Sequence, residues 1–260
     1  MVKGDIRIEN VNFKYRHTGV NAVKNFSLHI KPGQRIAIVG RTGSGKTTVA
    51  QLLMLMFDTD TGKILFDGMD IRKIDLQTLR KQISYVPQDG FLFSDTIMNN
   101  IAFASVASDP VKVKEAARLS VIDSDIEKFP QGYSTEIGER GVMLSGGQKQ
   151  RISIARALMK EAPVLILDDC LSAVDARTEK EIIGNFRSYL KDKTSILITH
   201  RIFSLFEFDK IIVMEEGVIV EEGRHEELLR KEGVYFEMYQ RQQKEDPDSA
   251  SGANLAVEKT

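Results

Sequence analysis

The stretch IAIVGRTGSGKTTVAQLL, residues 36–53, decides the fold class of this chain. Residues 36–39 form a continuous apolar run typical of a buried β-strand, and the glycine-rich turn after them leads into a helical segment that begins near Lys46. Strand, turn and helix in this order are the context that a phosphate-binding loop requires. Glycines let backbone N–H groups approach an anion closely, and a helix N-terminus favours negative charge. The stretch therefore predicts an α/β protein with a site for nucleotide phosphates.

The loop residues have separate expected roles. Lys46 is expected to reach the β- and γ-phosphates of ATP, and Thr47 is expected to place its hydroxyl on Mg²⁺. Asp168 ends another apolar run, residues 164–167, and a carboxylate at the end of a buried strand can hold the Mg²⁺ shell. The residues predicted to surround the phosphates are Gly40, Arg41, Thr42, Gly43, Ser44, Gly45, Lys46, Thr47 and Thr48. ATP with Mg²⁺ is therefore the predicted ligand.

Apolar periodicity predicts the architecture around the loop. Alternating apolar residues predict antiparallel strands near a sheet edge at residues 6–15 and 26–30. Short β-rich runs separated by helical segments predict a mostly parallel sheet covered on both faces, and they lie at residues 83–86, 164–167, 195–198 and 210–214. Residues from about 95 to 160 lack such runs, which predicts a helical insertion.

These patterns predict one ATP-binding domain over residues 1–243. Its core is expected at about 1–88 and 160–243, and its helical subdomain at about 89–159. From residue 244 to residue 260 the composition turns to Asp, Ser, Gly, Ala and Glu, so ordering this segment would bury too little apolar surface to offset the lost entropy. We expect a flexible tail there.

The composition excludes several classes of protein. With 260 residues, 42% of them hydrophobic and 28% charged, the chain can bury a core without disulfides. A net charge of −1 argues against nucleic acid as a partner. The one cysteine, Cys170, excludes a disulfide framework and fits a reducing compartment. No run of about 18 apolar residues is present to span a bilayer.

A second motif, LSGGQ at residues 144–148, lies between the phosphate-binding loop and the strand that ends at Asp168. This order of motifs resembles the ATP-binding cassette (ABC) ATPases, in which two cassettes enclose ATP between the loop of one and the LSGGQ signature of the other. The resemblance covers about residues 5–240. It implies an α/β P-loop NTPase core with a mostly parallel sheet, an antiparallel β subdomain and a helical insertion subdomain. It also implies a second cassette, identical or different, as a partner.

The resemblance assigns further residues to the site. The signature residues implied to contact ATP on the opposite cassette are Ser145, Gly146, Gly147 and Gln148, and a helix N-cap at Ser145 is compatible with that role. Tyr15 resembles the family's adenine-stacking aromatic, and Asp175 lies in a segment similar to the D-loop that crosses the dimer interface. Gln88 resembles the Q-loop glutamine that touches Mg²⁺ and the attacking water, and His200 resembles the switch histidine beside the γ-phosphate.

Two segments resemble those of exporters in this family. They are residues 90–97, which follow Gln88, and the sequence TEIGERG at residues 135–141. In exporters these segments receive the coupling helices of the membrane domain, so exposed Phe91 or Phe93 would form a docking surface. The resemblance therefore implies an ATPase that powers export from the cytoplasmic face of a membrane, as part of a longer chain with membrane helices before Gly4. It leaves the transported molecule open, because the membrane helices choose it.

Asp169 departs from the family pattern, which ordinarily has Glu after the strand-ending Asp. The carboxylate is one methylene shorter, and a misplacement of about 1 Å can lower a rate about 10²-fold. Asp at this position resembles heterodimeric exporters with one weakened site, and the alternative is a homodimer with slow hydrolysis. Two other interpretations stay open. They are a cassette ATPase that acts on DNA or the ribosome, and a regulatory module that closes on ATP with little hydrolysis.

Overall fold

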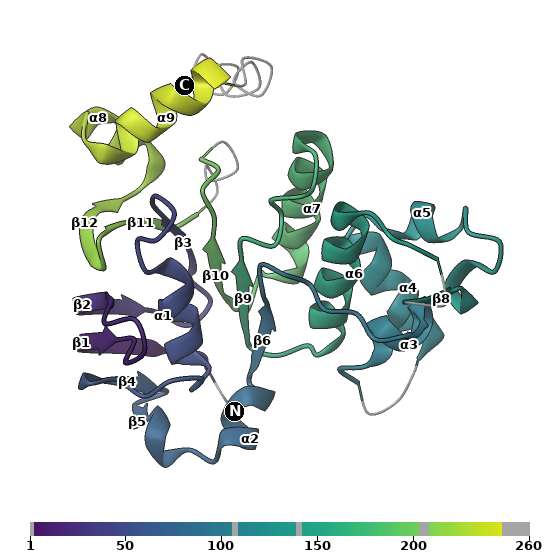
Figure 1. Ribbon diagram of the computed structural model, residues 1–260, viewed down its shortest axis with the longest axis horizontal. Helices are drawn as coiled ribbons and strands as arrows, with labels where there is room; N and C mark the ends of the chain where they lie inside the picture. The colour runs from purple at the N-terminus through teal and green to yellow at the C-terminus, as the bar shows by residue number, and fades with distance from the viewer. Residues whose placement is uncertain (1–2, 106–108, 139–141, 203–207, 246–260) are drawn as a thin grey trace. The chain divides into compact units, whose positions relative to one another are not determined.

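The computed structural model of the chain describes residues 3–105, 109–138, 142–202 and 208–245 (Figure 1). Its contacts divide the chain into two units, Met1–Arg80 with Thr194–Thr260 and the segment 81–193. The second unit is wider than the helical subdomain that the sequence predicts at about 89–159, because two strands that flank that segment pair with each other.

The first unit contains an antiparallel sheet and parallel strands around the phosphate-binding loop. The antiparallel sheet has the order β2 (Asn21–Ile30), β1 (Ile6–Lys14), β4 (Thr61–Phe66) and β5 (Met69–Asp70). Strand β3 (Arg35–Val39) pairs in parallel with β10 (Thr194–Ile198) and β11 (Lys210–Glu215), and β12 (Val218–Gly223) pairs with β11 in antiparallel orientation. The predicted antiparallel strands at residues 6–15 and 26–30 are confirmed.

A bulge in β1 explains the change of apolar parity along its sequence. Ile6 and Ile8 are buried at even positions, whereas Val11 and Phe13 are buried at odd positions. The pairing with β2 shifts between Ile8 and Val11, and Asn10 has a φ of 50°. The extra residue turns the later apolar side chains back to the same face of the sheet.

The helices of the first unit begin with α1 (Lys46–Leu53), which follows the phosphate-binding loop. The short helices η1 (Ile71–Lys73) and α2 (Leu76–Lys81) follow β5, and α8 (His225–Lys231) and α9 (Val234–Glu245) follow β12 (Figure 1). Helix α9 ends at Glu245, two residues into the segment 244–260 where the sequence predicts a flexible tail. The rest of the predicted tail, residues 246–260, lies outside the described residues.

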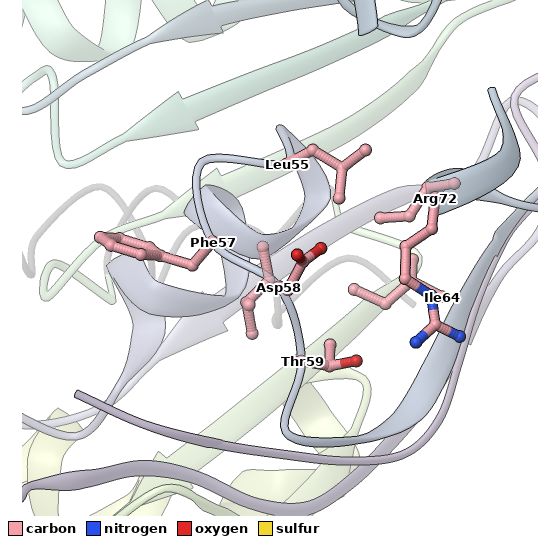
Figure 2. A pocket seen from close by; sticks show the side chains of 8 residues that line it. Leu55, Phe57, Asp58, Thr59, Ile64 and Arg72 are labelled. Atoms are coloured by element: carbon pink, nitrogen blue, oxygen red, sulfur yellow. The ribbon is translucent and has the colours of Figure 1, made fainter. Parts of the chain in front are cut away.

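A small surface hollow lies beyond the C-terminal end of α1 (Figure 2). Its lining residues are Leu52, Leu55, Phe57, Asp58, Thr59, Ile64, Ile71 and Arg72. Among the described residues, the Thr59 hydroxyl oxygen is buried here and has no hydrogen-bond partner. A buried hydroxyl without a hydrogen-bond partner lowers the free energy of unfolding, so we expect Thr59 to destabilise the first unit.

The second unit combines a parallel strand pair with a helical layer. Strand β6 (Ile83–Val86) pairs in parallel with β9 (Val164–Asp168), and β7 (Asp95–Thr96) pairs with β8 (Glu136–Ile137). The helices are α3 (Ile97–Ala102), α4 (Pro110–Leu119), α5 (Asp123–Ile126), η2 (Gly132–Ser134), α6 (Gly146–Met159) and α7 (Ala176–Tyr189). Helix α6 contacts α3 and α4 through buried apolar residues. In the part of the chain that the structure describes, no helix is both long enough and apolar enough to span a bilayer.

Candidate nucleotide-binding site

The phosphate-binding loop lies between β3 and α1 and packs closely against the backbone of β2 and β11. Gly45 caps α1 in the left-handed conformation, with a φ of 96°. A Cβ at Gly45 would lie 2.1 Å from the Ala22 carbonyl oxygen, and one at Gly40 would lie 2.2 Å from the Met214 carbonyl oxygen. Only glycine fits at either position, so strands β2 and β11 fix the path of the loop.

The Lys46 ammonium group folds back over the loop. It donates hydrogen bonds to the carbonyl oxygens of Gly40 at 2.9 Å and Arg41 at 2.8 Å, and to the Ser44 hydroxyl at 3.3 Å. At Gly43 a Cβ would meet no atom within 4 Å, so the loop is open on that side. An open glycine turn, an ammonium group and the N-terminus of α1 together fit a polyphosphate chain.

Tyr15 lies just after β1 and is anchored to α1. Its hydroxyl is 3.0 Å from the Thr48 hydroxyl and donates to the Gln51 side-chain oxygen at 2.9 Å. The ring makes edge contacts with Phe13 and Phe57, at centroid distances of 4.9 and 5.5 Å. These contacts hold an aromatic ring at a set place beside the helix that follows the loop, and stacking of adenine on Tyr15 stays a prediction.

His200 follows the strand next to the loop strand. Ile198 pairs with Ile38 in the parallel β10–β3 ladder, and the Thr199 N–H donates to the Ile38 carbonyl oxygen at 3.2 Å. Because parallel strands end at the same edge of a sheet, the ladder brings His200 to the edge where the loop begins. The Gln242 amide of α9 donates to the His200 carbonyl oxygen and accepts from the Ile202 N–H at 2.8 Å.

Asp168 lies at the end of β9 in the second unit and is fully buried. The Tyr85 hydroxyl on β6 donates to its carboxylate at 3.0 Å. Burial, together with the negative charge of Asp168, raises the pKa of Tyr85, so the phenol keeps its proton and orients the carboxylate. This contact of Tyr85 is not visible in the sequence, where the only local signal of the residue is its place in an apolar strand.

Asp169 has a φ of 47°, in the left-handed region. Asp and Asn adopt this conformation more easily than residues with longer side chains. The backbone therefore offers a physical reason for Asp at this position. The neighbouring Cys170 is fully buried, and burial raises the pKa of its thiol, as expected for a packed rather than a reactive residue.

The signature motif forms the N-terminus of α6. The Ser145 hydroxyl accepts from the Gln148 N–H at 3.2 Å, and the Gln148 side-chain oxygen accepts from the Ser145 N–H at 3.0 Å, which completes a capping box. The predicted helix cap at Ser145 is therefore confirmed. A Cβ at Gly147 would lie 2.8 Å from the Ala173 carbonyl oxygen, and one at Gly146 would lie 3.4 Å from the Ala173 methyl group. The signature glycines thus pack against the D-loop segment.

Gln88 and Asp175 lie on the two loops that flank α6. Gln88 follows β6 and is exposed, and Asp175 caps α7 by accepting from the Thr178 N–H at 3.0 Å. That hydrogen bond lowers the pKa of Asp175. Gln150 on α6 hydrogen-bonds to both loop segments, and the sequence analysis missed it. A polar residue at a buried position of a helix is the signal that could have found it.

The exporter-like segments are only partly described. Phe91 is 67% exposed and lies edge-on to Phe93 at a centroid distance of 5.1 Å, while Phe93 contacts Phe103 at 4.4 Å. The Arg156 guanidinium lies over Phe93 and donates to the Phe91 carbonyl oxygen at 2.7 Å. Within residues 135–141, the last three lie outside the described residues. The described part therefore presents a group of exposed aromatic rings that contact one another.

The predicted site residues divide between the two units. Tyr15, residues 40–48 and His200 belong to the first unit, whereas Gln88, residues 145–148 and the three aspartates belong to the second. Among the described residues, no group of three or more His, Cys, Asp or Glu side chains gathers in a way that could hold a metal ion.

Comparisons with known proteins identify the family. A family model described as "ABC transporter" matches residues 23–172. The iron-sulfur clusters transporter ATM1 of Yarrowia lipolytica is 43% identical over 243 residues, which are 94% of this chain and 34% of the relative. The ATP-dependent lipid A-core flippase of Escherichia coli K12 is 44% identical over 240 residues, 92% of this chain and 41% of the relative.

A solved structure of a bacterial Atm1-family ABC exporter with ATP bound has a TM-score of 0.87 and 41% identity, and the match covers 92% of this chain and 42% of that one. The chain thus spans between a third and about two fifths of the length of these relatives. The family match confirms the resemblance to ABC ATPases and the predicted α/β fold with parallel strands and an antiparallel subdomain. The chain therefore belongs to the ABC transporter family, as an ATPase domain of the exporter type.

Proposed function

We propose that this chain dimerises around ATP with a second cassette and powers export by membrane-spanning domains. The observation that supports the proposal is that one chain carries two helix N-termini of a kind that favours anions, at the loop before α1 and at the cap of α6. The loop of one cassette would hold the polyphosphate, and the helix N-terminus of the other cassette would face the same phosphates. Two cassettes related by a twofold axis would therefore enclose two nucleotides.

ATP with Mg²⁺ is the proposed ligand. Lys46 and the loop N–H groups hold the phosphates, while the Thr47 hydroxyl, Asp168 and Gln88 would hold the ion. An ion held there would supply positive charge next to the phosphoryl group that is transferred. Asp169 accepts a hydrogen bond from the attacking water and so orients it, and His200 contacts the γ-phosphate. In this proposal the orientation of Asp168 by Tyr85 supports the metal site.

The proposed partner surface for the membrane domains consists of residues 90–97 and 135–141. The aromatic group of Phe91, Phe93 and Phe103 supports this proposal, because its rings are exposed yet held in place by Arg156. Attachment to such domains would place the chain at the cytoplasmic face of a membrane. The second cassette is either a different chain with Glu at the position of Asp169 or a second copy of this one. The transported molecule depends on the membrane domains.

Lys46→Ala tests the proposal. The substitution removes the cation aimed at the phosphates, so binding of a fluorescent ATP analogue and Mg-ATP-dependent dimerisation are both expected to be lost. The matched control is Lys31→Ala, an exposed lysine of the same unit. Sedimentation of the wild type and both variants, with ATP, with ADP and without nucleotide, gives the readout. A dimer that forms equally well in the Lys46→Ala variant would refute the ATP-sandwich proposal.

A further inference from the structure

Gln150 joins two loops that are far from it and from each other in sequence. It lies on α6, five residues after the cap at Ser145, and is 7% exposed. Its side-chain oxygen accepts from the Ala173 N–H at 2.9 Å. Its side-chain NH₂ donates to the Ser172 hydroxyl at 3.2 Å and to the Gln88 carbonyl oxygen at 3.4 Å. One buried amide therefore contacts the Q-loop and the D-loop segments together.

The two loop segments are packed so closely against α6 that neither can move nearer to the helix. A Cβ at Gly147 would lie 2.8 Å from the Ala173 carbonyl oxygen, and one at Gly90 would lie 2.5 Å from the Ser153 hydroxyl. The D-loop segment thus lies close to Gly147 of α6, and Gly90 after the Q-loop lies close to Ser153 of α6, three residues to either side of Gln150. Packing that leaves no room for a Cβ resists a closer approach of the loops to α6, while the amide hydrogen bonds resist their separation.

The chemistry of the position calls for an amide. The Ala173 N–H needs an acceptor, and the Gln88 carbonyl needs a donor, so one side chain has to supply both. A carboxylate of the same shape would satisfy Ala173 but would face the Gln88 carbonyl without a proton to donate. An apolar side chain of similar size would leave the Ala173 N–H and the Gln88 carbonyl without these partners in a part-buried place.

We propose that Gln150 is a positioning residue that ties the Q-loop and the D-loop to the signature helix, so that the three move as one body. This inference rests on the proposed function for the roles of Gln88 and Asp175. A shift of the Q-loop, which adjoins the aromatic surface, would then carry the D-loop and the signature with it. Gln150 would therefore link docking at one surface with the geometry of both nucleotide sites of a dimer.

Gln150→Glu is the principal test, because it keeps the shape and the acceptor and removes the donor. Ser172→Ala removes one partner only, and Gln131→Glu is the matched control, since Gln131 is an exposed glutamine of the same unit. We expect amide hydrogen exchange of residues 86–90 and 170–175 to rise together in Gln150→Glu, by about five- to tenfold, because each segment loses one hydrogen bond from the Gln150 NH₂. Gln131→Glu should leave both segments at the wild-type rate.

Steady-state ATP hydrolysis gives the second readout. With the loops loosened, kcat is expected to fall between about tenfold and a hundredfold while KM stays within twofold, because the phosphate-binding loop is unchanged. Wild-type exchange in both segments of Gln150→Glu would overturn the inference, and so would faster exchange spread over the whole second unit, which would mark a purely structural role.

The exchange measurement needs no nucleotide, so it separates this inference from the proposed function. A wild-type chain that never dimerises or hydrolyses ATP would refute the proposed function. Coupled exchange of the two segments in that chain would still support the joining role of Gln150.

Discussion

Gly45→Ala tests how tightly the phosphate-binding loop is held by the strands beneath it. Two separate costs are expected. The first is the left-handed φ of 96°, which costs an L-residue about 1–2 kcal/mol. The second is the methyl group, which would lie 2.1 Å from the Ala22 carbonyl oxygen, where backbone has to shift to make room. Forcing extra volume into a packed site costs about 1–3 kcal/mol, so the total loss of stability is about 2–5 kcal/mol.

Gly43→Ala is the matched control for this prediction. Gly43 also has a positive φ, 83°, but a Cβ there would meet no atom within 4 Å. Only the conformational cost of about 1–2 kcal/mol applies, so the two variants differ by the steric cost of about 1–3 kcal/mol. Because 1 kcal/mol shifts the midpoint of a domain this size by about 2–4 °C, Gly45→Ala should melt about 2–12 °C below Gly43→Ala.

The assay is thermal unfolding of the two variants and the wild type without nucleotide, so that ligand binding does not mask the difference. Urea unfolding with unchanged slope would show that the denatured state is not the cause. Equal unfolding midpoints for Gly45→Ala and Gly43→Ala would refute the reasoning, since they would mean that the methyl group at position 45 does not clash with the Ala22 carbonyl oxygen.

Other substitutions test the site and the fold separately. Ser145→Arg should leave ATP binding by this chain intact and suppress hydrolysis at the opposite site of a dimer; loss of activity at the mutant chain's own loop, measured in mixed dimers, would contradict the sandwich. Asp169→Glu should raise phosphate release and Asp169→Asn should lower it, although the left-handed φ of 47° favours Asp; a wild-type rate equal to or above that of Asp169→Glu would show Asp169 to be a competent base. Tyr15→Phe should keep ATP affinity, although the protein loses two hydrogen bonds worth about 1 kcal/mol each. Tyr15→Ala should bind ATP severalfold more weakly than Tyr15→Phe, as measured by titration. Equal ATP affinities of the two variants would argue against stacking. Thr59→Val should raise the unfolding free energy by about 1 kcal/mol, because it removes a buried hydroxyl without a partner, and an unchanged or lower urea midpoint would refute this account.

The sequence alone predicted the parts of this protein that depend on neighbouring residues. The apolar run of β3, the glycine turn and the helix after it follow from dihedral preferences and periodicity within 18 consecutive residues, 36–53. The alternating apolar residues of the strand at 6–15 and the cap at Ser145 are local in the same way. The order of motifs then indicated the family, which the comparisons confirm.

The tertiary structure decided the contacts that join distant segments. Gln150 and Gln88 are 62 residues apart, Tyr85 and Asp168 are 83 apart, and Gln242 and His200 are 42 apart. Such pairs form because strand pairing and helix packing bring distant backbone segments together. Local propensity does not predict which residue of one segment will contact which residue of the other. Asp169 depends on both levels. The sequence shows that Asp stands where the family ordinarily has Glu, but only the fold shows the left-handed backbone that suits Asp. The end of the buried strand β9 and the turn after it set these dihedral angles.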